Sequence, residues 1–120
     1  MSRYRGLTLR VLGKGAPAMG PGKAELIVRI EQTGSISAAA RAMGMSYRRA
    51  WQLVESLNET YSEPVVKTAT GGSRGGGAQV TDFGRRLVTQ FRAMEDKASA
   101  AIASDLRRFA LHLRKPGKRR

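Results

Sequence analysis

Apolar positions in the first half of the chain recur every three or four residues, which is the period of amphipathic helices. The first such segment begins at Pro21 or Gly22 and runs to Thr33, and Gly34 follows at the position where helices commonly end. Its apolar stripe consists of Leu26, Ile27 and Ile30. The pattern therefore predicts a helix over 21–33 with one buried face.

Two shorter helical segments follow, and each is preceded by a serine that can cap a helix. Ser35 or Ser37 starts the first segment, which ends at Gly44, and Ser46 starts the second. The predicted buried faces are Ile36, Ala39, Ala40 and Met43 in the first segment and Ala50, Val54, Leu57 and Tyr61 in the second. Two short helices joined by a tight turn over 34–50 are typical of a helix-turn-helix, whose second helix enters the major groove of DNA.

Short apolar runs predict a small amount of β structure. Residues 4–12 alternate loosely between apolar and polar, which predicts a half-buried strand, and the glycine- and proline-rich stretch 13–22 predicts a loop. Residues 65–67 and 79–81 are predicted to be the two strands of a hairpin. The loop between them, Thr70–Gly77, is too rich in glycine to hold one conformation. A hairpin placed after a helix-turn-helix predicts the winged form of that motif.

The last third of the chain carries one long apolar stripe. Thr81 is a candidate cap, and apolar residues then follow one another by steps of four or three up to Leu113. A small domain cannot bury so long a stripe, so we expect a dimerisation helix over about 81–113. Its expected contacts are Leu87, Phe91, Met94, Ala98, Ile102 and Leu106. We accordingly expect one domain over 1–113 and a disordered basic tail over 114–120.

The charge composition limits the classes of partner that the chain can bind. The chain has 120 residues, with 22 Lys and Arg against 9 Asp and Glu, which gives a formal net charge of +13. Such an excess favours a polyanionic partner, nucleic acid first and an anionic membrane surface second. A basic ribosomal or nucleoid protein shows the same balance, so charge alone does not choose among nucleic-acid-binding proteins.

Several classes of site are excluded by the residues that are missing. The chain has no cysteine, and His112 is the only histidine, so neither a thiolate metal site nor a histidine-based triad can form. No run approaches the ~18 apolar residues of a membrane span. We expect no catalytic centre, no metal and no cofactor, and a cytoplasmic protein associated with the bacterial nucleoid.

Two motifs indicate a family. The run GSISAAARAMGMSYRRAW over 34–51, followed by TATGGSRGGGAQVTDFGRRLV over 68–88, resembles the N-terminal DNA-binding domain of ModE-type molybdenum-responsive transcriptional regulators. LysR-type regulators open with a related pattern, and the resemblance covers roughly Pro21 to Ala103. It implies an initial strand, a three-helix unit with a hairpin wing, and a long dimerising helix. Full-length members carry C-terminal molybdate-binding domains, whereas this sequence ends at Arg120, so we expect no oxyanion site and leave the effector unassigned.

The predicted recognition helix opens with side chains that suit DNA. Arg48 and Arg49 can bridge guanine or clamp a phosphate, although a solvated basic face is the alternative. Tyr47 can reach a phosphate or a thymine methyl, or its ring and that of Trp51 can pack against the preceding helix. Gln52 can reach adenine. The helix N-terminus at Ser46 favours anions.

Further contacts are expected on both sides of that helix. Ser35 and Ser37 suit phosphate binding, which is compatible with capping. In the glycine-rich loop, Arg74 can enter the minor groove or hold a phosphate, and the alternative is an ordinary surface turn. The full set of expected DNA contacts is Ser35, Ser37, Ser46, Tyr47, Arg48, Arg49, Gln52, Thr70, Ser73 and Arg74. The loop lacks the GK[ST] ending of a nucleotide-binding P-loop. Glu55, Glu59 and Glu63 read as a solvated flank rather than an acid pair.

The predicted fold is thus mainly α with a small β part, a winged helix-turn-helix with a long C-terminal dimerisation helix. The predicted function is sequence-specific binding of double-stranded DNA by a homodimeric transcriptional regulator. One alternative is an architectural, nucleoid-type protein that binds DNA without reading its sequence. Another is an adaptor whose long helix docks on a different protein.

Overall fold

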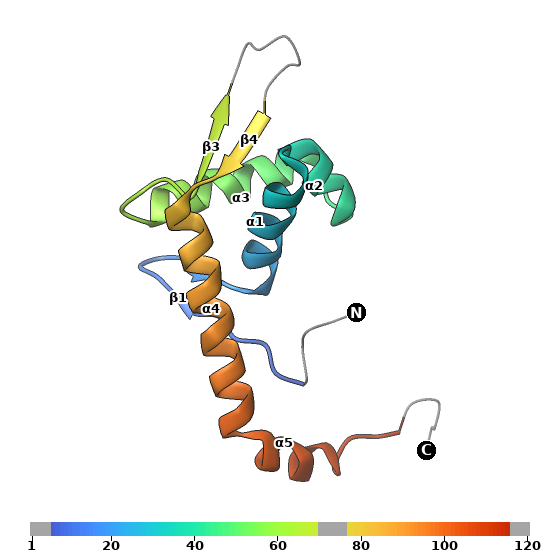
Figure 1. The fold of residues 1–120 in the computed structure, drawn as a ribbon. Helices are drawn as coiled ribbons and strands as arrows, with labels where there is room; N and C mark the ends of the chain where they lie inside the picture. The colour runs from blue at the N-terminus through green and yellow to red at the C-terminus, as the bar shows by residue number, and fades with distance from the viewer. Residues whose placement is uncertain (1–5, 70–76, 116–120) are drawn as a thin grey trace.

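Three short helices form the centre of the computed structural model, which describes residues 6–69 and 77–115 (Figure 1). They are α1 (Pro21–Thr33), α2 (Ile36–Ala42) and α3 (Tyr47–Thr60). Their bounds confirm the three helices expected from the apolar spacing. The largest fully buried side chains come from α1, α3 and the start of the hairpin that follows: Leu26, Ile27, Ile30, Leu57, Val54, Val65 and Val66.

Local signals end and begin these helices. Gly34 adopts a left-handed conformation with φ of 69°, which glycine reaches without a Cβ penalty, and its N–H donates to the Ile30 carbonyl. The Ser35 hydroxyl accepts from the N–H of Ala38, so Ser35 rather than Ser37 caps α2. Small buried residues, Ala39, Ala40 and Ala50, let α2 and α3 approach closely.

The hairpin that follows α3 consists of β3 (Val66–Ala69) and β4 (Gly77–Val80). The strands are antiparallel, with Val66 opposite Val80 and Ala69 opposite Gly77. Against the predicted strands 65–67 and 79–81, β3 begins one residue later and ends two later, and β4 begins two residues earlier and ends one earlier. Figure 1 shows the hairpin rising away from the helices as a wing. The predicted mobile tip, including Thr70, Ser73 and Arg74, lies outside the described residues.

The N-terminal β structure differs from the prediction. The described part of the expected strand is paired only at β1 (Val11–Leu12), and its partner β2 (Pro17–Met19) falls where we expected a loop. Contacts distant in sequence hold β2: Tyr61 Oη donates to the Ala18 carbonyl over 2.8 Å, and burial raises the pKa of Tyr61. Glycine and proline on either side of β2 conceal it from a local reading.

The expected single long helix is two helices, α4 (Asp82–Ala101) and α5 (Ala103–Ala110). Thr81 caps α4 as predicted, since its hydroxyl accepts from the Gly84 N–H over 2.9 Å. Ile102, with φ of −112° and ψ of 15°, interrupts the helix, and Figure 1 shows α5 turning away from the α4 axis. The break carries no glycine or proline, and the apolar spacing continues through it, so periodicity could not locate it.

Burial also corrects the expected dimerisation stripe. Phe91 is only 3% exposed and belongs to the core of its own chain, and Leu87 packs against that core. These two side chains are therefore taken up within the monomer. Ala98, Ile102 and Leu106 are half-buried, whereas Met94 is 44% exposed and Phe109 65% exposed. The apolar surface open to a partner lies further toward the C-terminus than the sequence indicated.

Candidate nucleic-acid interface

The outward face of α3 is basic and exposed to solvent. Ala50, Val54 and Leu57 are fully buried on the inner face. Arg48 and Gln52 are exposed one helical turn apart on the opposite side, and Arg49 is exposed beside them. No described residue forms an ion pair or hydrogen bond with the Arg48 or Arg49 guanidinium. Two arginines held on a rigid helix without an internal partner are free to bind an anion or a base edge.

The two aromatic side chains at the start of α3 differ in exposure. Tyr47 and Trp51 meet edge to face, with ring centroids 6.4 Å apart, and the Trp51 indole N–H donates to the Tyr47 hydroxyl. Trp51 is half-buried and packs against the core, while Tyr47 remains 53% exposed. The Tyr47 hydroxyl accepts from Trp51, so its own proton is free for a donor contact with an external acceptor.

The serines have different local partners. The Ser46 hydroxyl accepts from the Arg49 N–H over 3.0 Å, which confirms the predicted cap of α3. The Ser37 hydroxyl accepts instead from the Arg41 guanidinium, also over 3.0 Å. Capping aligns the free N–H groups at the start of α3 toward solvent, where a phosphate is favoured.

The two flanks of α3 are fixed to different elements. On one flank, Asn58 Oδ1 accepts from the N–H groups of Val65 and Val66 over 2.8 and 3.1 Å, and its Nδ2 donates to the Val66 carbonyl over 2.9 Å. These bonds attach the base of the wing to α3. On the other flank, Lys23 Nζ of α1 lies 3.4 Å from the Ser56 hydroxyl.

Two basic residues near α3, Lys23 and Arg10, were not among the DNA contacts expected from the sequence. Burial, with smaller contributions from the charges of Arg49 and Arg10, lowers the pKa of Lys23. The charges of Arg10 and Arg49 thus act on Lys23, although the three residues are far apart in the sequence. No local motif marks them, and only the general excess of basic residues could have drawn attention to them.

The described acidic residues on α3 and after it, Glu55, Glu59 and Glu63, are exposed, as expected of a solvated flank.

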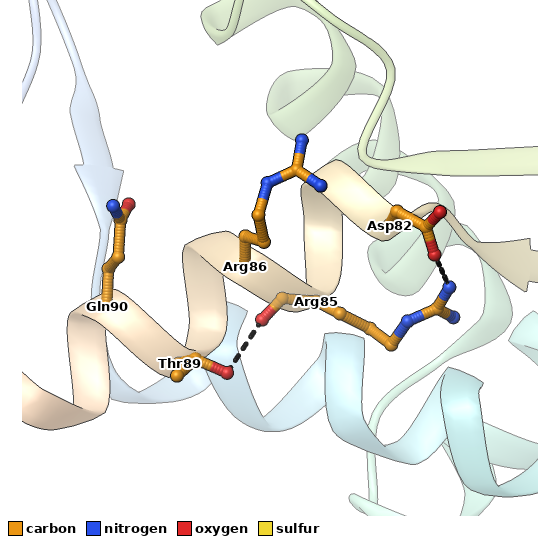
Figure 2. A pocket seen from close by; sticks show the side chains of 5 residues that line it. All are labelled: Asp82, Arg85, Arg86, Thr89 and Gln90. Carbon is orange, nitrogen blue, oxygen red and sulfur yellow. Dashed lines mark hydrogen bonds and ion pairs between the residues drawn. The ribbon is translucent and has the colours of Figure 1, made fainter.

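A shallow depression lies along the first turns of α4, between Asp82, Arg85, Arg86, Thr89 and Gln90 (Figure 2). One of its two arginines is already paired: Arg85 bonds to Asp82 and to Glu31, and these bonds raise the pKa of Arg85, the one to Asp82 more strongly. Within the described ranges no helix has the length and apolarity to cross a membrane.

A capped helix pair, an exposed basic face on the second helix and an anchored hairpin define a winged helix-turn-helix DNA-binding domain. The chain belongs to the family described as bacterial regulatory helix-turn-helix protein, lysR family, whose model matches residues 22–85. This match confirms the predicted winged helix-turn-helix class, and the relatives that follow confirm the resemblance to the N-terminal domain of ModE-type regulators.

Curated relatives agree. The chain is 39% identical over 85 residues to the molybdenum transport protein ModE of Azotobacter vinelandii, covering 71% of this chain and 32% of that protein. It is 43% identical over 88 residues to the transcriptional regulator ModE of Yersinia pestis, covering 71% and 34%. Over 94 residues it is 40% identical to the molybdenum-pterin-binding protein MopB of Rhodobacter capsulatus, covering 78% and 35%. The chain thus spans about a third of the length of these relatives.

A solved structure shows the same fold. It is the full-length LysR-type regulator LysG of Corynebacterium glutamicum with bound effector Arg, with a TM-score of 0.53 and 26% identity. The similarity covers 77% of this chain and 30% of LysG.

Proposed function

We propose that the chain is a sequence-specific transcriptional regulator that binds double-stranded DNA as a homodimer. The observation that carries the proposal is the exposed face of α3, where Arg48, Arg49 and Gln52 lie free of described partners beside an anchored wing. In this arrangement α3 enters the major groove and the wing lies on the backbone or in the minor groove. The net charge of +13 supplies a sequence-independent attraction to DNA.

Roles on α3 follow from position. Arg48 and Gln52 lie opposite the buried face and point furthest into a groove, so they read base edges. Tyr47, Ser35, Ser37 and Ser46 lie toward the helix N-termini, where phosphates bind. Thr70, Ser73 and Arg74 of the wing complete the proposed contacts.

We predict that Arg48→Ala weakens binding to the specific site by about 1–3 kcal/mol and leaves binding to random DNA nearly unchanged, because a bidentate contact to guanine is lost. Fluorescence anisotropy with a duplex recovered from genomic DNA and a scrambled duplex measures both. Arg86→Ala, which removes an exposed arginine from α4, is the matched control and should change neither affinity. An equal loss on both duplexes would make Arg48 a phosphate clamp and contradict its reading role.

The homodimer rests on the exposed apolar surface of α4 and α5. Met94 of α4 and Phe109 of α5 are exposed, and Ile102 and Leu106, which lie between them in the sequence, are half-buried. Figure 1 shows the end of α4 and the whole of α5 extending well beyond the three-helix unit. A second copy would bury this surface and place two α3 helices about 34 Å apart, on successive turns of DNA.

We expect the chain to be dimeric in light scattering, and the double variant Met94→Glu, Phe109→Glu to raise its dimer dissociation constant at least about tenfold, because buried glutamates carry a desolvation penalty. Lys97→Glu, an exposed change on α4, is the control that should leave the dimer intact. A monomeric parent chain would contradict the homodimer and leave this surface to a foreign partner.

The second candidate is an architectural DNA-binding protein, which the charge of +13 also favours. It differs in needing no base reading from Arg48 or Gln52. We also propose a cytoplasmic location, as expected of a protein that meets chromosomal DNA, and assign no effector.

A further inference from the structure

Basic side chains from separate elements lie around the start of α1, where Lys23 Nζ reaches Ser56 of α3 over 3.4 Å and Arg49 lies on the same flank of α3, two helical turns before Ser56. Arg10 precedes β1, Lys23 lies in the first turn of α1, and Arg49 lies in the first turn of α3. We call this group the α1 corner. The Arg10 side chain lies over Gly20, with its Nε 3.7 Å from the point where a Cβ would stand, and Lys23 Nζ donates to the Pro17 carbonyl over 2.7 Å.

The α1 corner lacks the internal neutralisation found elsewhere on α1. Along that helix, Glu25 pairs with Arg29 over 2.8 Å and with Arg92 over 3.3 Å. Within the described ranges, by contrast, no carboxylate forms an ion pair with Arg10, Lys23 or Arg49. Neighbouring cations without a counter-charge repel one another, and such a cluster is stabilised when an anion binds.

The position of the α1 corner beside α3 indicates which anion it would meet when α3 lies in the major groove. On one flank of α3, Ser56 contacts Lys23, and on the other flank Asn58 bonds to the wing. Figure 1 shows the wing and the β1–β2 hairpin on opposite sides of α3. A helix in the major groove, which is about 12 Å wide, has a phosphate strand on each side. The wing is placed to meet one strand and the α1 corner to meet the other.

We propose that the α1 corner binds a backbone phosphate of the DNA strand that borders α3 on the side opposite the wing. The inference rests on the proposed DNA-binding function and adds Lys23 and Arg10 to its contacts. Arg49 then acts on the backbone, which leaves base reading to Arg48 and Gln52. A phosphate contact of this kind strengthens binding to every sequence and depends strongly on salt.

The test compares Lys23→Gln with Lys97→Gln, which removes the same charge from an exposed position on α4. Affinity is measured from 50 to 200 mM salt on the specific and the scrambled duplex. Lys23→Gln should flatten the plot of log affinity against log salt by about one unit on both duplexes and weaken binding up to about eightfold at 0.1 M salt. Lys23→Arg should restore the slope of the parent chain.

Lys23→Gln also removes the two hydrogen bonds that Lys23 Nζ donates, to the Pro17 carbonyl and the Ser56 hydroxyl, so a second variant separates contact from folding. Arg10→Gln removes a side chain that bonds to no described residue, and it should flatten the slope in the same way. Slopes for Lys23→Gln and Arg10→Gln that match those of the parent and Lys97→Gln would overturn the proposal. Failure of the parent chain to bind either duplex would instead overturn the proposed function itself.

Discussion

Gly84→Ala is expected to lower the free energy of unfolding by about 3 kcal/mol, the upper part of the range for overpacking. In an exposed helix the same change stabilises by up to about 1 kcal/mol. Here a Cβ would stand 2.5 Å from the Val65 carbonyl oxygen and 3.0 Å from Val80 Cγ1. The Val65 carbonyl also accepts from the Thr81 N–H over 3.0 Å, so it cannot retreat without breaking the junction between the wing and α4.

The matched control for this change is Gly22→Ala. Gly22 also lies in the first turn of a helix, but a Cβ there would meet nothing within 4 Å. We expect a neutral effect or a gain of about 0.5–1 kcal/mol. Urea unfolding of both variants, followed by circular dichroism, measures the difference. Similar stabilities for the two would show that α4 does not depend on close approach at position 84.

Asn58→Ala is expected to cost about 3 kcal/mol of stability and to weaken DNA binding further. The change deprives the N–H groups of Val65 and Val66 of their acceptor and the Val66 carbonyl of a donor. Each buried polar group left without a partner costs about 1–3 kcal/mol. Since both valines are almost fully buried at the base of the wing, water cannot readily replace the amide.

Gln52→Ala is the matched stability control, because it removes an exposed amide from the same helix. We expect its unfolding free energy to lie within about 0.5 kcal/mol of the parent chain. Urea unfolding compares the stabilities of the two variants. Fluorescence anisotropy, at a temperature where Asn58→Ala is folded, measures whether the variant binds DNA less tightly. Parent-like affinity of the folded Asn58→Ala protein would mean that the wing does not need this anchor to bind DNA.

The features predictable from the sequence are those with local causes. Ser46 and Thr81 bond to N–H groups three residues ahead, and Gly34 supplies a left-handed turn, so each is visible in a short window. The buried face of α3 follows from periodicity alone. The basic residues at the start of α3 are exposed as expected, and their contact with DNA remains a proposal.

The features that the sequence concealed depend on contacts between distant residues. Strand β2 is held by Tyr61, which lies 43 residues from Ala18. Phe91 matches the spacing of a dimer stripe, yet its own chain buries it. Lys23 reaches Ser56 only once α1 packs on α3. Periodicity shows that a side chain is apolar or basic on one face, but not which chain or element meets that face.

The most direct test of sequence-specific regulation is the ratio of two dissociation constants. DNA fragments retained by the chain from a genomic pool are sequenced, and the Kd for a shared site is measured beside that for a scrambled duplex of equal length and salt. We expect a ratio of about 10³ or more in favour of the shared site. A ratio near one would contradict this expectation and identify an architectural DNA-binding protein.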